Sequence, residues 1–423
     1  MLEPNASSES WKFHPDRDFL ISEAHARPSE TISGPANMLH LAFRAEPAVR
    51  RQFFHKLNPN EDALLVRHIS ATLGMVRVKL EYHTEFMSCT VFQEEVAADN
   101  QEDLVDFLSQ NFPMGDVEIL VLLKLNLLKS DDDLCVCFPN EQRLYGGILR
   151  KGIDVRSGFV PDENGFIQFS MHAKGMTNDE IGRRLQRLVE METYRTMALL
   201  GLPEARKVSA ELTNLEKELE DLTRLLGGST NNTQQESESH FERLSMLSER
   251  SNVLATNTRY RFAASLAYAA LFEQRLDSLE EEKVGKLQTM SGFLKSRFEP
   301  AIATIESTRR RQDTLTNDLS RTLVLLRTRI QLNLAKGNQA QLQSMNKRHD
   351  QQLKISQTVE GLSIVAITYY AVGLVSYLLK AAADQSWSPL SETLMTAISV
   401  PFVLVIVWAL LRRLRKAWEN SAP

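Results

Sequence analysis

The stretches LSIVAITYYAVGLVSYLL, residues 362–379, and LMTAISVPFVLVIVWALL, residues 394–411, decide the architecture of this 423-residue chain. Neither stretch contains Asp, Glu, Lys or Arg. A helix of this length spans roughly 27 Å, close to the thickness of the hydrocarbon core of a bilayer. Buried helices of a soluble protein are the alternative. Two such stretches, joined by a short, mostly polar or small-residue connection, predict a transmembrane hairpin.

Basic residues around the two stretches predict their orientation. Three precede the first stretch within 347–354, four follow the second within 412–416, and the connection contains only Lys380. Because Lys and Arg are enriched on the cytoplasmic side, we expect both termini in the cytosol and the connection outside. Residues 1–20 lack the apolar core of a cleavable signal peptide, so the bulk of the chain is expected to stay in the cytosol.

Charge and cysteine content exclude several classes of partner. The net charge is −5, and residues 1–175 alone hold 17 basic against 26 acidic side chains. An acidic domain repels a phosphate backbone, so we expect no nucleic-acid partner. Cys89, Cys135 and Cys137 match no zinc or redox spacing. They are expected to be buried thiols in a reducing compartment.

The patterning predicts an α+β protein with four segments. These are an α/β sheet domain (1–175), a stalk of long antiparallel or coiled-coil helices (176–360), the transmembrane hairpin (361–412) and a basic cytosolic tail (413–423). In the first segment the predicted strands cover 76–82, 119–128 and 134–138, the last two joined by a turn at 130–133. A hairpin is predicted over 158–171, turning at 161–165, with helices over 46–57, 60–73 and 101–111.

The stalk is predicted from helical periodicity. Asn178 or Asp179 can cap a helix that Gly201, Leu202 and Pro203 stop at Leu200. A heptad seam follows at Val208, Leu212, Leu215, Leu219, Leu222 and Leu226. After a flexible turn at 227–235, a helix over 236–298 is expected to return antiparallel until Pro300 breaks or kinks it. A last helical run, 301–360, enters the first span without a turn signal.

Small and polar residues line one face of the first span. They follow heptad spacing at Ser363, Ala366, Tyr370, Gly373, Tyr377 and Lys380, with Ile364, Val372, Val375 and Leu379 on the opposite, lipid-facing side. Such a face packs helices together in lipid, here against the second span or a neighbouring subunit of a homo-oligomer. The sharper hypothesis is a polar lumen in an oligomer, in which a ring of Lys380 would repel cations.

Two clusters in the first segment carry metal-ligating or ionisable groups. Glu23, His25 and Arg27 share a face if extended, as do Glu81, His83 and Glu85. Carboxylates and imidazoles can hold a divalent metal or another ligand. The structural alternative is an ion pair of the Arg27–Glu85 type and two hydrogen-bonded histidines. The acidic run 131–133 is more typical of a solvated turn than of a cation site.

Four short motifs carry a family resemblance over nearly the whole chain. They are HARP (25–28), EYHTEF (81–86), ETYR (192–195) and VEGLS (359–363), the last followed by Tyr369 and Tyr370. In this order they resemble a bacterial family of predicted membrane-anchored proteins whose domain has no assigned function. The resemblance implies an anchor in the inner (cytoplasmic) membrane, and neither an activity nor a cofactor.

The order of segments is also similar to that of the CorA-type divalent-cation transporters. The start of the first span, residues 362–366, is similar to theirs, but their Gly-Met-Asn signature is absent, and residues 379–382 read LKAA instead. Three hypotheses remain: an oligomeric transporter or channel, a non-conducting scaffold that holds a binding domain at the membrane, and an enzyme using the His25 and His83 region. No phosphate loop, nucleophile elbow or paired catalytic carboxylates occur, so we expect no enzyme.

Overall fold

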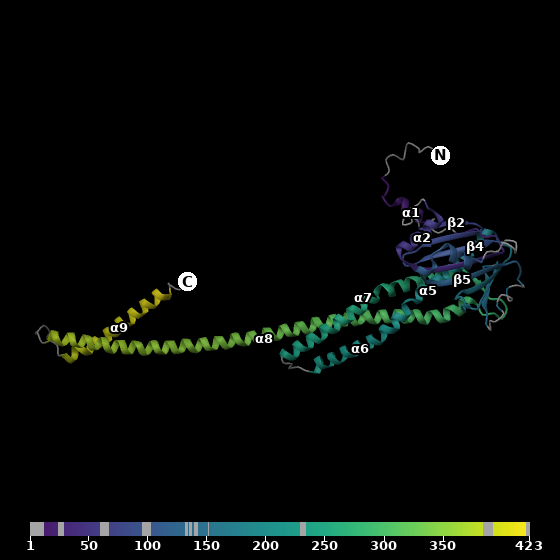
Figure 1. The fold of residues 1–423 in the computed structure, drawn as a ribbon. Helices are drawn as coiled ribbons and strands as arrows, with labels where there is room; N and C mark the ends of the chain where they lie inside the picture. Colours follow the sequence, from purple (N-terminus) through teal and green to yellow (C-terminus); the bar gives the residue numbers. More distant parts are fainter. Residues whose placement is uncertain are drawn as a thin grey trace. The chain divides into compact units, whose positions relative to one another are not determined.

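The computed structural model describes residues 12–23, 29–59, 67–94, 103–131, 134, 138, 143–150, 152–228, 234–383 and 392–419. The chain divides into two compact units, Met1–Leu323 and Val324–Pro423. The protein is of the α+β class: a sheet precedes a series of long helices, and two apolar helices end the chain (Figure 1).

The first unit is built on a nine-stranded sheet in the described residues, ordered β2-β3-β4-β1-β5-β8-β7-β6-β9. The strands are β1 (Ala36–Ala45), β2 (His68–Leu73), β3 (Val76–Tyr82), β4 (Met87–Glu94), β5 (Val117–Leu128), β6 (Tyr145–Leu149), β7 (Ile153–Ser157), β8 (Ile167–Ala173) and β9 (Glu281–Glu282). Neighbouring strands are antiparallel except for β5 and β8, which are parallel.

Both faces of the sheet are covered, so the interior strand β1 is buried on two sides. On one face, Leu39, Leu41 and Phe43 of β1 pack with α2 (Pro47–Leu57) and α3 (Leu104–Asn111). On the other, Met38 and Ala42 pack with α5 (Asn178–Leu199). Two short helical segments, α1 (Arg17–Glu23) and η2 (Met114–Asp116), complete the elements before α5.

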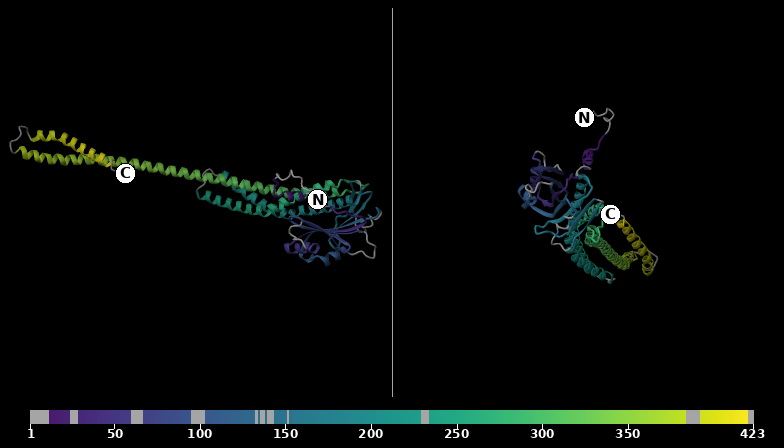
Figure 2. Two further views of the ribbon diagram at one scale, coloured as in Figure 1. Left: turned by 90° about the horizontal axis from the view of Figure 1, so that it is seen from above. Right: turned by 90° about the vertical axis from the view of Figure 1, so that its right-hand side faces the viewer.

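Three long helices follow α5. They are α6 (Gly201–Gly228), α7 (Gln234–Ser278) and α8 (Met290–Ala383), and α6, α7 and the first part of α8 lie side by side (Figure 2). The predicted heptad positions from Val208 to Leu222 are all buried, and Leu226 is half-buried. Hydrogen bonds of Gln312 with Thr258 and of Arg311 with Glu216 join α8 to α7 and α6.

The second unit contains the rest of α8 and α9 (Glu392–Glu419). Both helices contain a segment long and apolar enough to cross a membrane, and almost none of the residues in those segments is fully buried in the single chain. In Figures 1 and 2, α9 returns alongside the last turns of α8. The continuous passage of α8 through Gly361 confirms that the stalk enters the first apolar stretch without a turn.

Two predictions in the sheet were wrong. Residues 68–73 of the predicted 60–73 helix form β2, because Ile69 and Thr72 favour a strand and Gly74, at φ +62°, folds it back onto β3. Leu134 is helical rather than the start of the strand predicted over 134–138. Both edges of β5 already bond to β1 and β8, which leaves no edge for that strand. Residues 135–137 lie outside the described residues.

The hairpin was predicted with the correct turn and a displaced first strand. Asp162 accepts hydrogen bonds from the backbone N–H groups of Asn164 and Phe166, and Gly165 takes φ +87°, so 161–165 does reverse the chain. Its first strand is β7, which ends at Ser157, before the predicted start. The helices predicted over 46–57 and 101–111 are confirmed as α2 and α3.

The helical segment required three corrections. The N-cap of α5 is Thr177, which exchanges hydrogen bonds with Glu180 in a capping box, rather than Asn178 or Asp179. The predicted 236–298 helix is interrupted after Ser278, where β9 joins the sheet beside β6. Pro300 lies inside α8 without ending it. Because Pro300 is exposed, the carbonyl that loses its intrahelical donor can bond to water.

Candidate functional sites

Glu81 lies on β3, on the face that α5 covers, and is buried. Its carboxylate forms an ion pair with Lys79 of the same strand, with Nζ and Oε1 3.1 Å apart and both side chains buried. Leu185 and Val189 of α5 lie against the same small cavity. Glu81 is therefore neutralised by its own strand, since a buried charge is tolerated only with a partner.

His83 and Glu85 follow β3, which ends at Tyr82, so they do not continue its alternation. The His83 ring stacks on Phe86, with centroids 4.1 Å apart. Both oxygens of Glu85 accept hydrogen bonds from Arg261 of α7, each at 3.1 Å. The predicted common face of Glu81, His83 and Glu85 is thus not formed.

Glu85 also faces two tyrosines of α7. Burial raises the pKa of Tyr268, and the Glu85 carboxylate raises it further by accepting a hydrogen bond from its phenol. The pKa of Tyr260 is raised in the same way. The carboxylate is held by groups from a helix far along the chain, and this contact ties the β3–β4 turn to α7.

His25 and Arg27 lie outside the described residues. Glu23 ends α1, so it is helical and not part of an extended segment. Among the described residues, Glu85 forms its ion pair with Arg261. No group of three or more His, Cys, Asp or Glu able to hold a metal occurs among the described residues. A ligand or metal site around His25 and Arg27 stays a prediction.

Asp131 is the described member of the acidic run 131–133. Its Oδ1 lies 3.2 Å from Nδ1 of His172 on β8. His172 is paired across the sheet with Asp154, which Arg156 binds through both carboxylate oxygens. Burial raises the pKa of Asp154 despite that partner. Asp132 and Asp133 lie outside the described residues.

The sequence analysis missed a buried polar network centred on His40 of β1. Nδ1 of His40 lies 2.8 Å from the Thr90 hydroxyl, and Nε2 lies 3.2 Å from the hydroxyl of Thr193 on α5. Burial, followed by the charge of Lys79, lowers the pKa of His40 to about 3, so the ring is neutral. No local signal marked this residue, because the sequence analysis did not predict β1.

The fold brings together two of the motifs that lie more than a hundred residues apart. Tyr194 of the ETYR motif stacks on Tyr268 at 6.0 Å, and Phe86 of the EYHTEF motif contacts the same ring at 6.2 Å. Glu192, fully buried, is bound by Arg195. These two motifs therefore join the sheet to α5 and α7, and the described contacts give them a structural role.

The polar face of the first span is exposed in the single chain. Tyr370 and Tyr377 are 72% and 76% exposed, and a Cβ added at Gly373 would meet no atom within 4 Å. Ser363 bonds to the carbonyl of Val359 in its own helix. Ala366 and Lys380 are also exposed, and Gly373 is half-buried.

The opposite face of α8 is the covered one. Its buried or half-buried positions include Ile364, Thr368, Ala371, Val372, Val375 and Leu379, and those of α9 include Thr396, Ser399, Val403 and Val407. Because these positions follow helical spacing on both helices, they are the faces that α8 and α9 turn toward each other. Val372 was predicted to face lipid and instead lies on the α9 side. The second span does not cover the polar face.

One family model matches nearly the whole chain. It is the model of DUF3422, a protein of unknown function, and it matches residues 12–418. The chain belongs to the DUF3422 family. No curated protein matches the chain. The DUF3422 match includes both units and both candidate spans, in agreement with the resemblance carried by the four motifs.

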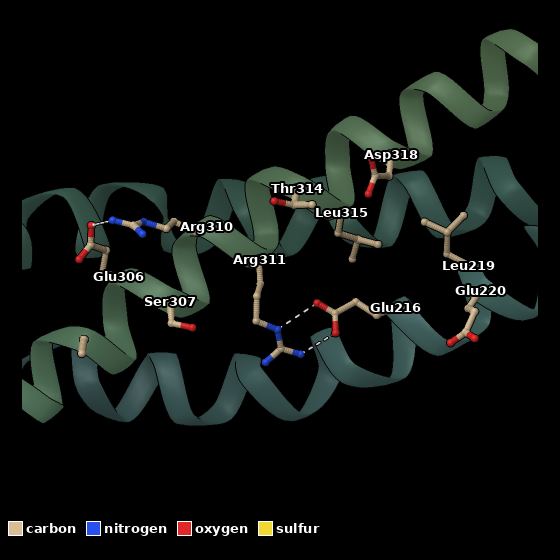
Figure 3. Close-up of a pocket in the computed structure, with 11 residues that line it drawn as sticks. Glu216, Leu219, Glu220, Glu306, Ser307, Arg310, Arg311, Thr314, Leu315 and Asp318 are labelled. Atoms are coloured by element: carbon tan, nitrogen blue, oxygen red, sulfur yellow. Dashed lines mark hydrogen bonds and ion pairs between the residues drawn. The ribbon is translucent and has the colours of Figure 1, made fainter.

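The first unit of this DUF3422 member also has a groove of about 640 Å³ between α6 and α8 (Figure 3). Arg311 crosses it to bind both oxygens of Glu216, at 2.9 and 2.7 Å. This hydrogen bonding raises the pKa of Arg311. Glu306 pairs with Arg310, and Glu220 with Arg224. These charges are neutralised within the chain, so the groove offers little to a charged ligand.

Proposed function

We propose that the protein is a membrane-anchored homo-oligomer in which the polar faces of several α8 helices surround an ion passage. The observation that carries this proposal is the division of α8 into two faces. Thr368 and Val372 lie on the side that α9 covers, whereas Tyr370 and Tyr377 are exposed and a Cβ added at Gly373 would meet no atom within 4 Å. A two-helix anchor would need only the covered face.

The chemistry of the exposed face favours helix association over contact with lipid. Tyrosine hydroxyls that face hydrocarbon lack hydrogen-bond partners, which costs free energy. Gly373 and Ala366 permit close approach of backbones, the main source of attraction between helices in a membrane. Neighbouring copies of α8 would supply both the partners and the contact area.

The charge of Lys380 would influence which ions pass. Lys380 ends the polar face at what we propose is the outer membrane surface, and a ring of lysines repels cations and attracts anions. The absent Gly-Met-Asn signature points the same way, although the order of segments is similar to the CorA type. An anion is therefore the better-supported cargo.

The proposed location is the inner membrane of a bacterium, with both termini in the cytosol. A cysteine introduced at Ser386, in the connection, should react with an impermeant maleimide added to intact cells, and one at Ser421 should not. Reaction at Ser421 from outside would contradict this orientation.

A non-conducting scaffold is the second candidate. Tyr370 and Tyr377 favour it, because two layers of large aromatic rings could fill the axis of the oligomer. The sheet unit would then be a cytosolic binding domain held at the membrane. In both candidates the protein has no catalytic role.

Purified protein in liposomes separates these candidates. We expect a defined oligomer in mild detergent and an anion flux, measured with a chloride-sensitive dye, that depends on the protein. Gly373→Leu should weaken the oligomer and the flux together. Val365→Leu is the matched control, since it places the same side chain at an exposed position to one side of the polar face.

The outcomes are distinct. A monomer in both detergent and liposomes would contradict the assembly. An intact oligomer that conducts neither anions nor cations would contradict transport and support the non-conducting scaffold. Equal behaviour of Gly373→Leu and Val365→Leu would show that the polar face is not the interface.

A further inference from the structure

The stretch of α8 before the first span is exposed at every residue from 331 to 359. In the part of the chain that the structure describes, no other element covers it. An isolated helix in water is only marginally stable, because most helical stability in proteins comes from packing an apolar face. This helix nevertheless presents Leu342, Met345, Leu353, Ile355 and Val359 to solvent, each about half exposed or more.

Three of these residues, Leu342, Met345 and Val359, belong to a regular pattern. Steps of three and four residues lead from the stalk into the span, through Leu342, Met345, His349, Gln352, Ser356 and Val359, and then through the polar face from Ser363 to Lys380. We name the positions from Leu342 to Val359 the stalk seam. A repeat of this kind keeps one stripe of a helix facing a partner over many turns. The stalk seam and the polar face are thus one uninterrupted stripe.

Charges are excluded from the stalk seam. Lys347 and Lys354 occupy the heptad position farthest from it, and Asp350 also lies on the far side. Arg348 and Glu360 flank the stripe, in positions where parallel copies would not oppose like charges. A surface for lipid headgroups would instead gather its basic residues on one face, so the arrangement favours a helix as partner.

We propose that the stalk seam is a parallel, in-register interface with the same residues of a second copy of this chain. The proposal rests on the membrane anchoring of the proposed function, because anchoring gives all copies one direction and one depth. Each residue then meets its own equivalent. His349, Gln352 and Ser356 form polar layers, which fix register at some cost in stability.

Disulfide cross-linking of the full-length protein in liposomes tests this interface. Met345→Cys places a thiol on the stalk seam, and Asp350→Cys places one on the far side of the helix in the next turn. Because a disulfide needs Cβ atoms about 4 Å apart, mild oxidation should give about tenfold more covalent dimer from Met345→Cys. The parent protein, with its native cysteines, gives the background.

Each outcome decides the proposal. Equal dimer yields from the two variants, or none above background from Met345→Cys, would overturn it. A Gly373→Cys variant separates its failure from that of the proposed function. Cross-linking at Gly373 but not at Met345 would support the oligomer and contradict the interface at the stalk seam. Cross-linking at Met345 in a protein that shows no ion flux would support the interface at the stalk seam and contradict the proposed transport.

Discussion

Two helices of one chain, α5 and the 331–359 stretch of α8, differ in what surrounds them. In α5 even polar side chains are buried with partners: Glu192 with Arg195, and Thr193 with His40. In the α8 stretch every residue is exposed, including large apolar ones. The sheet unit is therefore completed by its own chain. The α8 stretch relies on intrinsic helix propensity and, we propose, on a second copy.

The largest effect on stability is expected in the first unit, at the heptad leucines that pack α6 into the helical bundle. Leu215→Asp with Leu222→Asp should detach α6 from the bundle. Both leucines are about 1% exposed; each contributes about 1.5–3 kcal/mol by burial, and a buried charge costs more. Limited proteolysis near Gly227 should become faster while the sheet still resists.

The matched control for this change is Leu225→Asp, on the same helix at an exposed position. It introduces the same charge without removing a buried side chain. Protease resistance that is equal in the double variant and the control would show that the heptad leucines do not hold α6 in place.

The next effect concerns the contact between Glu85 and Arg261. Glu85→Ala leaves a largely buried guanidinium without its carboxylate, which should cost about 3–5 kcal/mol. Arg261→Ala should cost a similar amount, and the double variant less than the sum. Thermal unfolding of the full-length protein in detergent measures the coupling.

The pair of Glu218 with Arg250 provides the comparison for that cycle, since both side chains are about half exposed. Exposed pairs contribute about 0–1 kcal/mol, so Glu218→Ala should have little effect. If the two pairs gave the same coupling, the β3–β4 turn would not depend on α7.

Which parts of the fold could be predicted from the sequence depended on whether the pattern that encodes them is local. The apolar stretches, the turn at Asp162 and the heptad leucines are encoded within a few residues, and each was found. The capping box of Thr177 and Glu180 is equally local and was overlooked. The β2–β3 hairpin, which turns at Gly74, is local too, and its first strand was mistaken for a helix.

The candidate site depended on contacts that no local pattern contains. Arg261 meets Glu85 across 176 positions, and Thr193 meets His40 across 153. Spacing within 81–85 suggested a shared face, but the strand ends at Tyr82 and the two carboxylates reach different partners. The sequence showed that Glu81 and Glu85 carry ionisable groups, but their partners became apparent only from the fold.

A smaller effect follows from His40, whose folded-state pKa is about 3 against an ordinary value of about 6.5. Above pH 6.5 the ring is neutral in both states. As the pH falls below 6.5, the unfolded chain binds a proton that the folded protein does not, so stability is lost progressively toward pH 3. Between pH 7 and pH 5 the loss should be about 2 kcal/mol.

The His40→Gln variant isolates this contribution. Glutamine keeps a polar group that can bond to Thr90 and Thr193 but does not titrate. Its unfolding free energy, measured by urea titration at both pH values, should change by about 2 kcal/mol less than that of the parent. An unchanged pH dependence would assign the acid sensitivity to other groups.

The smallest effect is expected at Gly337 in the exposed part of α8, and the same substitution at Gly182 in α5 provides the contrast. In α5, a Cβ at Gly182 would lie 1.6 Å from the backbone oxygen of Glu30, so Gly182→Ala must displace backbone and destabilise the sheet unit. In α8, a Cβ at Gly337 would meet no atom within 4 Å. Gly337→Ala should therefore stabilise the helix by about 0.5–1 kcal/mol, because glycine loses more backbone entropy than alanine.

Hydrogen exchange measures both sites in the full-length protein. Peptides around Gly337 should exchange about twofold to fivefold more slowly after Gly337→Ala, the factor that corresponds to this free energy, while sheet peptides stay unchanged. Gly337 lies off the stripe that continues the stalk seam, so the added methyl does not disturb association with a second copy. If the substitution at Gly337 instead accelerated exchange, its surroundings would be packed, and the contrast between α5 and the exposed part of α8 would not hold.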